Sequence, residues 1–239
     1  EWSVKNPKEF WKSIWDFTNV KGDARTLLMQ ESKTFYKNKF FPESELNYAE
    51  NLLKKNNSKP AIIFKSENGS KKTLSWNQLN TNIAKVSNWM RSHGIERGDR
   101  VAAYMPNIPE TVIAYLSSSV IGSIWSSCSP DFGITGVIDR FSQINPKILF
   151  IGDKYFYNGK KINILERLPE ILNKVKSIKT VVIVPYPKTK IKNNYIVKIN
   201  KYFWNELIEN KEKTKIKYEI SNFNDPLVIL YSSGTTGKP

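Results

Sequence analysis

The sequence is short of the residues that build disulfides and metal centres. It contains one cysteine, Cys128, and one histidine, His93, among 239 residues. A lone cysteine cannot form a disulfide within the chain, which favours a reducing compartment and a cytoplasmic protein. So few cysteines and histidines exclude a Cys/His zinc cluster. We therefore expect no metal site of this kind. Since no histidine lies near Cys128 in the sequence, we expect it to be a small buried residue rather than a nucleophile.

Long apolar runs are also absent. A membrane-spanning helix needs about 20 consecutive apolar residues, and no stretch of this sequence approaches that length. The first residues contain no basic stretch followed by an apolar run, so we expect no secretory signal there. Hydrophobic residues still make up 40% of the chain and aromatic residues 13%. That composition supports a packed core and argues against disorder.

Acidic residues are scarce beside basic ones, with 22 Asp and Glu against 37 Lys and Arg, and the net charge is +15. Such a charge is compatible with a basic module that binds nucleic acid or a membrane surface. However, lysine far outnumbers arginine, and the lysines are spread along the whole chain. A nucleic-acid surface more often uses clustered arginine, which makes bidentate contacts. The pattern therefore favours a compositional bias, part of which suits small polyanionic ligands.

Short apolar strands alternate with helices along most of the chain. Residues 61–65 and 73–76 are expected to form two strands around an Asn-Gly turn. A long helix should follow from Ser75 to His93 and end at Gly94. Further strands are expected at 100–105, 123–127, 147–152, 180–185 and 226–231, and further helices at 109–122, 136–144, 164–176 and 202–209. This alternation predicts an α/β fold with a mainly parallel sheet flanked by helices.

Two helices are expected before this pattern begins. In the first, Asn6 is the candidate N-cap, Pro7 suits the first turn and Glu9 completes a capping-box pattern. Its apolar residues fall on one face at helical spacing, and they are Phe10, Trp11, Ile14 and Trp15. A shorter helix is expected within 45–55. We therefore divide the chain into an N-terminal helical region, 1–58, and a larger α/β domain, 59–239.

The strongest motif is YSSGTTGKP at 231–239, directly after an apolar strand. Gly234 and Gly237 allow positive φ and a close approach of the backbone to a ligand. Lys238 adds a cation that can neutralise developing pyrophosphate charge. The hydroxyl donors are Ser232, Ser233, Thr235 and Thr236. Together with backbone N–H groups they can surround polyphosphate oxygens, and ligands of open α/β sheets lie beyond the carboxyl ends of strands. The motif therefore predicts a phosphate-binding loop.

This loop is not a Walker A motif, which reads G-x-x-x-x-G-K-[ST]. The first glycine of that motif would fall on Ser232, and its final hydroxyl residue would fall on Pro239. Proline cannot supply the hydroxyl that binds Mg²⁺. A flexible Ser/Gly turn after a strand is the structural alternative, but it does not account for so many phosphate-compatible groups behind a buried strand.

The motif resembles the signature of the AMP-forming, adenylate-forming superfamily, which includes acyl-CoA synthetases, luciferases and peptide-synthetase adenylation domains. The lysine that closes the family signature would follow Pro239. Upstream, LNYAENLL at 46–53, GDRVAAYMPNIPETVIAYL at 98–116 and WSSCSPDFG at 125–133 extend the resemblance. These segments look most similar to the acetoacetyl-CoA synthetase branch. The stretch before LNYAENLL looks shorter than in that branch.

The resemblance implies the N-terminal portion of the acyl-adenylate-forming synthetase fold and an acid–thiol ligase. The implied substrates are ATP with Mg²⁺, CoA and acetoacetate, with acetate or propionate as the alternative acids; nucleic acid and a membrane span are not implied. The family's adenine-binding segment, magnesium-binding glutamate, ribose-binding aspartate and C-terminal lysine would all follow Pro239. We therefore expect these 239 residues alone not to complete catalysis.

The resemblance also implies two further sites. Lys160 and Lys161 would approach the 3′-phosphate end of CoA, although they also suit the role of solvated surface lysines. The segment from Trp125 to Gly133, at the end of the expected strand 123–127, would line or support the acyl and CoA channel. Its candidate residues are Trp125, Ser129, Asp131 and Phe132. The alternative is a structural turn in which Asp131 caps the next helix.

Overall fold

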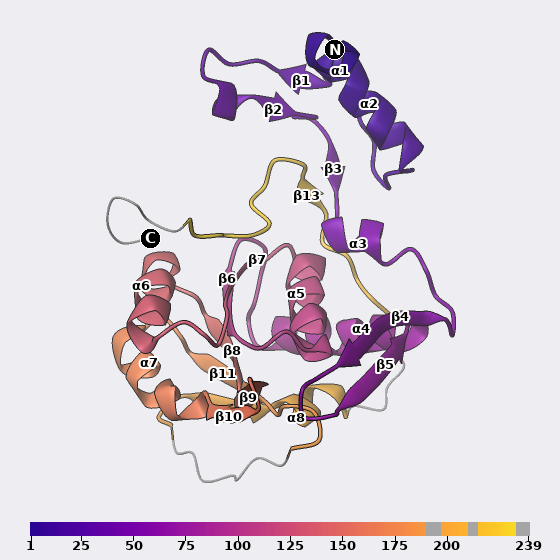
Figure 1. Cartoon of the computed structure of the whole chain (residues 1–239). Coiled ribbons are helices and arrows are strands. Elements are labelled where there is room, and N and C mark those ends of the chain that lie inside the picture. Colours follow the sequence, from indigo (N-terminus) through magenta and orange to yellow (C-terminus); the bar gives the residue numbers. More distant parts are fainter. Residues whose placement is uncertain (190–196, 210–214, 233–239) are drawn as a thin grey trace.

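The computed structural model describes residues 1–189, 197–209 and 215–232. Figure 1 shows a small N-terminal unit set apart from a larger body built around a sheet. The chain connects the two units twice. β3 (Glu45–Leu46) leads out of the N-terminal unit, and β13 (Ser221–Asn222) pairs with it antiparallel much later in the sequence.

Five strands form the central sheet, and every neighbouring pair is parallel. In spatial order they are β12 (Asn200–Phe203), β11 (Thr180–Val184), β8 (Ile148–Gly152), β6 (Arg100–Tyr104) and β7 (Ile124–Cys128). All residues of β8 and β11 are buried, as expected for parallel strands covered on both faces. The predicted α/β fold with a mainly parallel sheet is confirmed.

Helices pack on both faces of this sheet (Figure 1). One face is covered by α4 (Trp76–Ser92), α5 (Pro109–Ile121) and α8 (Trp204–Ile208), and the other by α6 (Ile134–Ile144) and α7 (Leu168–Lys174). In β6, Val101 and Ala103 belong to the first core, whereas Ala102 and Tyr104 belong to the second. Successive side chains of a strand point to opposite faces, so each strand contributes to both cores.

The local signals read from the sequence are mostly found where expected. β4 (Pro60–Lys65) and β5 (Lys71–Ser75) form the predicted hairpin, and Gly69 adopts φ +76° in its turn. Ser75 caps α4, and Gly94, at φ +75°, follows its end. Residues 202–203 were expected to be helical but extend β12, because they pair with β11. This pairing outweighs the local helical pattern.

The N-terminal unit departs from expectation at its cap. Asn6 lies between α1 (Trp2–Lys5) and α2 (Pro7–Phe17) but makes no capping bond through its side chain. Its Nδ2 instead donates to the Trp2 carbonyl at 3.1 Å, so the expected capping box is wrong. The remaining short elements of the unit are β1 (Met29–Gln30), η1 (Phe35–Lys37) and β2 (Lys39–Phe40).

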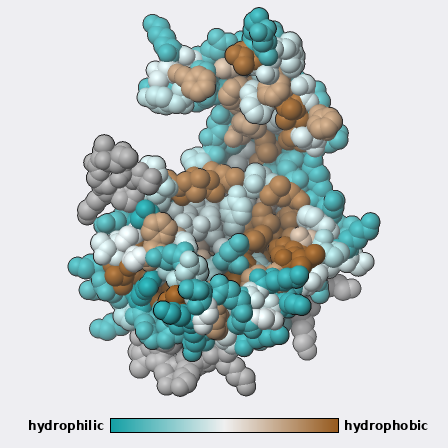
Figure 2. Space-filling model, viewed as in Figure 1, coloured by the Kyte–Doolittle hydropathy of each residue, from teal (hydrophilic) through white to brown (hydrophobic). Residues whose placement is uncertain are grey.

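The apolar face of α2 is only partly covered. Trp15 is buried against Phe41, with ring centroids 4.7 Å apart, whereas Trp11 remains 42% exposed. Figure 2 shows further hydrophobic residues on this unit and on the part of the body that faces it. Within the described ranges, no helix combines the length and hydrophobicity that crossing a bilayer requires.

The final described segment, 226–231, runs beside β7 but is shorter as a strand than expected. It forms a single parallel bridge, between Val228 and Trp125. The Trp125 N–H donates to the Leu227 carbonyl at 3.1 Å, and the Ile229 N–H donates to the Trp125 carbonyl at 2.8 Å. Leu230 is 79% exposed, and no second strand among the described residues lies on that side to extend the ladder. The segment therefore occupies the sixth position of the sheet, next to β7.

Candidate functional site

The segment 226–231 leads to the carboxyl edge of the sheet, where the predicted phosphate-binding loop begins. The Ser126 hydroxyl donates to the Ile229 carbonyl at 3.0 Å, which adds a side-chain tie to the backbone bridge. Ser232 is exposed at the end of the segment. The other predicted phosphate-binding residues, Ser233, Gly234, Thr235, Thr236, Gly237 and Lys238, lie outside the described residues.

The predicted channel segment follows β7 at the same edge. Ser129, Asp131 and Phe132 are all exposed, and the Ser129 hydroxyl donates to the Asp131 carboxylate at 3.0 Å. Gly133, not Asp131, is the N-cap of α6, so the alternative helix-capping role of Asp131 is wrong. Trp125 is 6% exposed and belongs to the core beneath α5. The structure therefore places Trp125 as a support of this edge and the other three residues on its surface.

Two residues that sequence reasoning missed hold this segment in place. The Tyr104 hydroxyl, at the carboxyl end of β6, donates to the Phe132 carbonyl at 2.8 Å. Arg167, in η2 (Leu165–Arg167), donates from Nη1 to the Pro130 carbonyl at 3.2 Å, to the Phe132 carbonyl at 3.0 Å and to the Tyr104 hydroxyl. Burial raises the pKa of Tyr104 although Arg167 opposes this shift, so the phenol stays protonated. Charge-assisted bonds of this kind are the stronger hydrogen bonds in proteins.

A hairpin places the two predicted CoA-contacting lysines near the same edge. β9 (Lys154–Tyr157) and β10 (Lys160–Asn163) pair antiparallel directly after β8. Lys160 and Lys161 are both exposed. Burial, and after it the interaction with the Asp131 carboxylate, raises the pKa of Tyr155 in β9. The hairpin and the segment after β7 therefore belong to one continuous surface.

Arg140, on α6, links the segment after β7 to the end of segment 226–231. Its guanidinium carbon lies 4.3 Å from the ring centroid of Phe132 and 5.5 Å from that of Tyr231. The Tyr231 hydroxyl donates to the Arg140 carbonyl at 2.6 Å. Arg140 therefore holds Tyr231, the residue immediately before Ser232, both at its ring face and through its hydroxyl.

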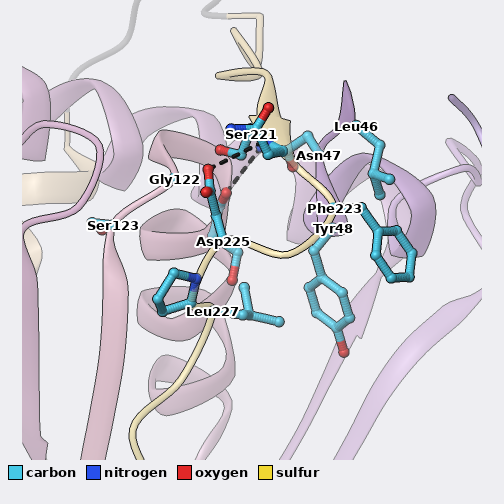
Figure 3. A pocket seen from close by; sticks show the side chains of 12 residues that line it. Leu46, Asn47, Tyr48, Gly122, Ser123, Ser221, Phe223, Asp225 and Leu227 are labelled. Atoms are coloured by element: carbon cyan, nitrogen blue, oxygen red, sulfur yellow. Dashed lines mark hydrogen bonds between the residues drawn. The ribbon is translucent and has the colours of Figure 1, made fainter. Parts of the chain in front are cut away.

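A separate cavity of about 220 Å³ lies at the opposite edge of the sheet. Figure 3 shows Asn47, Gly122, Ser123 and Ser221 around it. The Asn47 amide donates to the carbonyls of Ser119, Val120 and Glu219 at 2.8 to 3.3 Å. Gly122 and Ser123 directly precede β7, so the cavity lies at the amino end of that strand. It is distant from the carboxyl edge where the sequence motifs gather.

The arrangement is that of an open α/β protein with its sequence motifs at the carboxyl edge of a parallel sheet. A hydroxyl- and glycine-rich motif follows an edge segment at the carboxyl ends of parallel strands, the place where such sheets bind ligands. Among the described residues, no group of three or more His, Cys, Asp or Glu could hold a metal ion.

The AMP-binding enzyme family matches residues 49–239, and the chain belongs to this family. It is 38% identical over 239 residues to acetoacetyl-coenzyme A synthetase of Rhizobium meliloti, and this match covers 100% of this chain and 36% of that protein. It is 39% identical over 249 residues to acetoacetyl-CoA synthetase of Xenopus tropicalis, covering 100% of this chain and 37% of that one.

A solved structure gives the same picture of the fold. The acetoacetyl-CoA synthetase of Streptomyces lividans matches with a TM-score of 0.89 and 31% identity, over 100% of this chain and 36% of that one. The chain thus spans little more than a third of the length of these relatives. The match covers the N-terminal unit as well as the sheet.

We predict that Cys128 reacts slowly with a disulfide reagent in the folded protein. It is 2% exposed, and burial raises the pKa of its thiol to about 11, against a smaller opposing effect of Arg140. At a pH near the usual cysteine pKa of about 8.5, thiol labelling should be slow until guanidinium chloride unfolds the chain. Equal labelling rates in the folded and unfolded states would contradict this, and Cys128→Ser should abolish the signal.

The raised pKa of Cys128 also sets the pH range over which the thiol contributes to folding stability. The buried thiol binds its proton more tightly than the unfolded chain does, so this contribution is complete below about pH 8.5. This contribution is lost as the pH rises through about 11.

Proposed function

We propose that the protein containing this chain ligates acetoacetate to CoA at the expense of ATP, through an acyl-adenylate. The observation that carries the proposal is the pairing of segment 226–231 with β7, which brings Tyr231 and Ser232, the first residues of the signature motif, to the carboxyl edge of the sheet. Family membership and the printed names of the similar proteins support the same chemistry. We infer that Mg²⁺ enters with ATP.

The proposed reaction has two steps. A carboxylate oxygen of acetoacetate attacks the α-phosphorus of ATP, the bond between that phosphorus and the bridging oxygen to the β-phosphate breaks, and pyrophosphate leaves. The CoA sulfur then attacks the activated carbonyl, the thiol proton goes to a base, and AMP leaves. Phosphoryl transfer depends mainly on positioning and charge neutralisation. In this proposal Ser232, Ser233, Gly234, Thr235, Thr236, Gly237 and Lys238 hold the β- and γ-phosphates.

The remaining assignments are proposals of the same kind. The surface formed by Ser129, Asp131 and Phe132 would border the acyl and CoA channel, with Trp125 supporting it from the core. Lys160 and Lys161, exposed on the adjoining hairpin, would contact the 3′-phosphate end of CoA in this proposal. We further propose a boundary near residue 58 between the N-terminal region and the synthetase domain, and a cytoplasmic location.

The acid is the least constrained part of the proposal. Acetate and propionate remain the alternatives, because the candidate site contains few groups that would contact the acid itself. The names of the similar proteins favour acetoacetate. The spread of the lysines along the whole chain argues against nucleic acid as a ligand.

We predict that acetoacetate is the preferred acid of the full-length protein. Pyrophosphate release should be measured with acetoacetate, acetate and propionate under matched conditions. A pocket that fits the keto group should give acetoacetate a kcat/KM at least about tenfold higher than propionate. Equal values, or a higher value for acetate, would assign the protein to another branch of the family.

We predict that Lys160 and Lys161 contribute to CoA binding. Replacing both by alanine in the full-length protein should raise the KM for CoA by about threefold to tenfold, because two cations near a phosphate are lost. The KM for ATP should stay within a factor of about two. A matched control is Lys174→Ala, Lys176→Ala, which removes two charges beside α7 at the amino edge. An unchanged KM for CoA in the Lys160/Lys161 variant would reject the contact.

A further inference from the structure

Arg140 connects two parts of the candidate site that are far apart in the sequence. Its guanidinium carbon lies within 5.5 Å of the ring centroids of both Phe132 and Tyr231. Cation–π contacts are effective up to about 6 Å from the centroid. The Arg140 Nη1 also donates to the Gly136 carbonyl, one turn earlier in α6, at 2.9 Å. The side chain is thus tied to its own helix while it contacts two rings.

Gly136 provides the space for this arrangement. A Cβ at this position would lie 3.3 Å from the Arg140 Nη1 and 3.4 Å from the Phe132 Cδ1. A larger side chain would press on the guanidinium and on the ring that it contacts. The absence of a side chain at Gly136 therefore permits close packing of Arg140 and Phe132.

The two aromatic partners differ in what else holds them. The backbone of Phe132 is fixed by Tyr104 and Arg167, which donate to its carbonyl at 2.8 and 3.0 Å. Tyr231 receives the Arg140 guanidinium on its ring, and its hydroxyl donates to the Arg140 carbonyl. Loss of the Arg140 side chain therefore leaves 129–133 anchored by Arg167. The same loss removes the contact of the guanidinium with the ring of Tyr231, the residue next to Ser232.

We propose that Arg140 is a positioning residue that fixes Tyr231, and with it the start of the phosphate-binding motif, against the segment after β7. The inference rests on the proposed function, because it assigns Arg140 an effect on ATP rather than a contact with it. Replacing an arginine with a merely structural role on α6 would lower stability but would not change the KM for ATP relative to the KM for CoA. Replacing an arginine that positions Tyr231 should raise the KM for ATP more than the KM for CoA.

The test uses Arg140→Ala and Arg140→Lys in the full-length protein. We expect Arg140→Ala to raise the KM for ATP in acetoacetate-dependent ATP–pyrophosphate exchange by about tenfold, which corresponds to about 1.4 kcal/mol. The KM for CoA in the overall reaction should change by less than about threefold. Lysine keeps the charge but lacks the planar group that packs between two rings. Arg140→Lys should therefore recover less than half of the loss.

Arg100→Ala is the matched control. The Arg100 Nε donates to the Ile144 carbonyl at 2.7 Å, so this arginine also braces α6, but at the amino edge of the sheet. We expect it to leave the KM for ATP within a factor of about two while lowering the melting temperature. If Arg140→Ala left the KM for ATP unchanged, raised both KM values equally, or was fully rescued by lysine, the inference would be overturned.

A second measurement does not depend on activity. Hydrogen exchange at the amide of Ile229, whose N–H donates to the Trp125 carbonyl at 2.8 Å, should be faster in Arg140→Lys than in the wild type, and unchanged in Arg100→Ala. Equal exchange in all three proteins would also overturn the inference. A wild-type protein without ATP–pyrophosphate exchange would reject the proposed function, and this inference with it. An active wild type with an indifferent Arg140→Ala would reject only the role of Arg140.

Discussion

The backbone pairing between Trp125 and segment 226–231 is the constraint on which the site depends. Two hydrogen bonds of 2.8 and 3.1 Å join this segment to β7. They determine that the chain reaches the carboxyl edge of the sheet at Tyr231 and Ser232, beside the segment after β7. Without this pairing, Tyr231 and Ser232 would have no fixed relation to Phe132 or to Arg140.

The core supports this edge directly. Tyr104 is fully buried within the core beneath α6 and α7, yet its hydroxyl reaches the carbonyls of Pro130 and Phe132. Trp125 fills the opposite core, while its backbone pairs with the final segment. The same residues therefore pack the sheet and position the surface above it. Protein interiors are densely packed and transmit strain, so substitutions in this part of the core should affect the site as well as stability.

Much of the fold could be predicted because its signals are local. Alternation of apolar strands with helices is enough to indicate a parallel sheet, and Ser75 and Gly94 mark the ends of α4 by their own chemistry. The capping box predicted at Asn6 is wrong for a local reason that the sequence pattern does not reveal. The Asn6 side chain finds the Trp2 carbonyl in the preceding turn instead of the first turn of α2.

The candidate site could be predicted only in part. Its hydroxyl and glycine residues form a compact motif, and Ser129, Asp131 and Phe132 follow a recognisable strand. Arg140 was missed because Tyr231 lies 91 residues away in the sequence, and Arg167 because its partners lie 35 to 63 residues away. Neither arginine belongs to a motif, and only the folded sheet brings them to these carbonyls and rings. Trp125 sits within the motif-like segment, but the alternation of β7 directs it into the core.

Amide hydrogen exchange at Ile229 tests the pairing most directly. Its N–H donates to the Trp125 carbonyl, so the exchange rate should be at least about 100-fold slower than in the unfolded chain, an opening free energy of about 2.8 kcal/mol. The Trp125 amide, which donates to Leu227, should be protected to a similar degree. Exchange of Ile229 at the rate of an unfolded peptide would contradict the pairing, and with it the placement of Tyr231 and Ser232 at the carboxyl edge of the sheet.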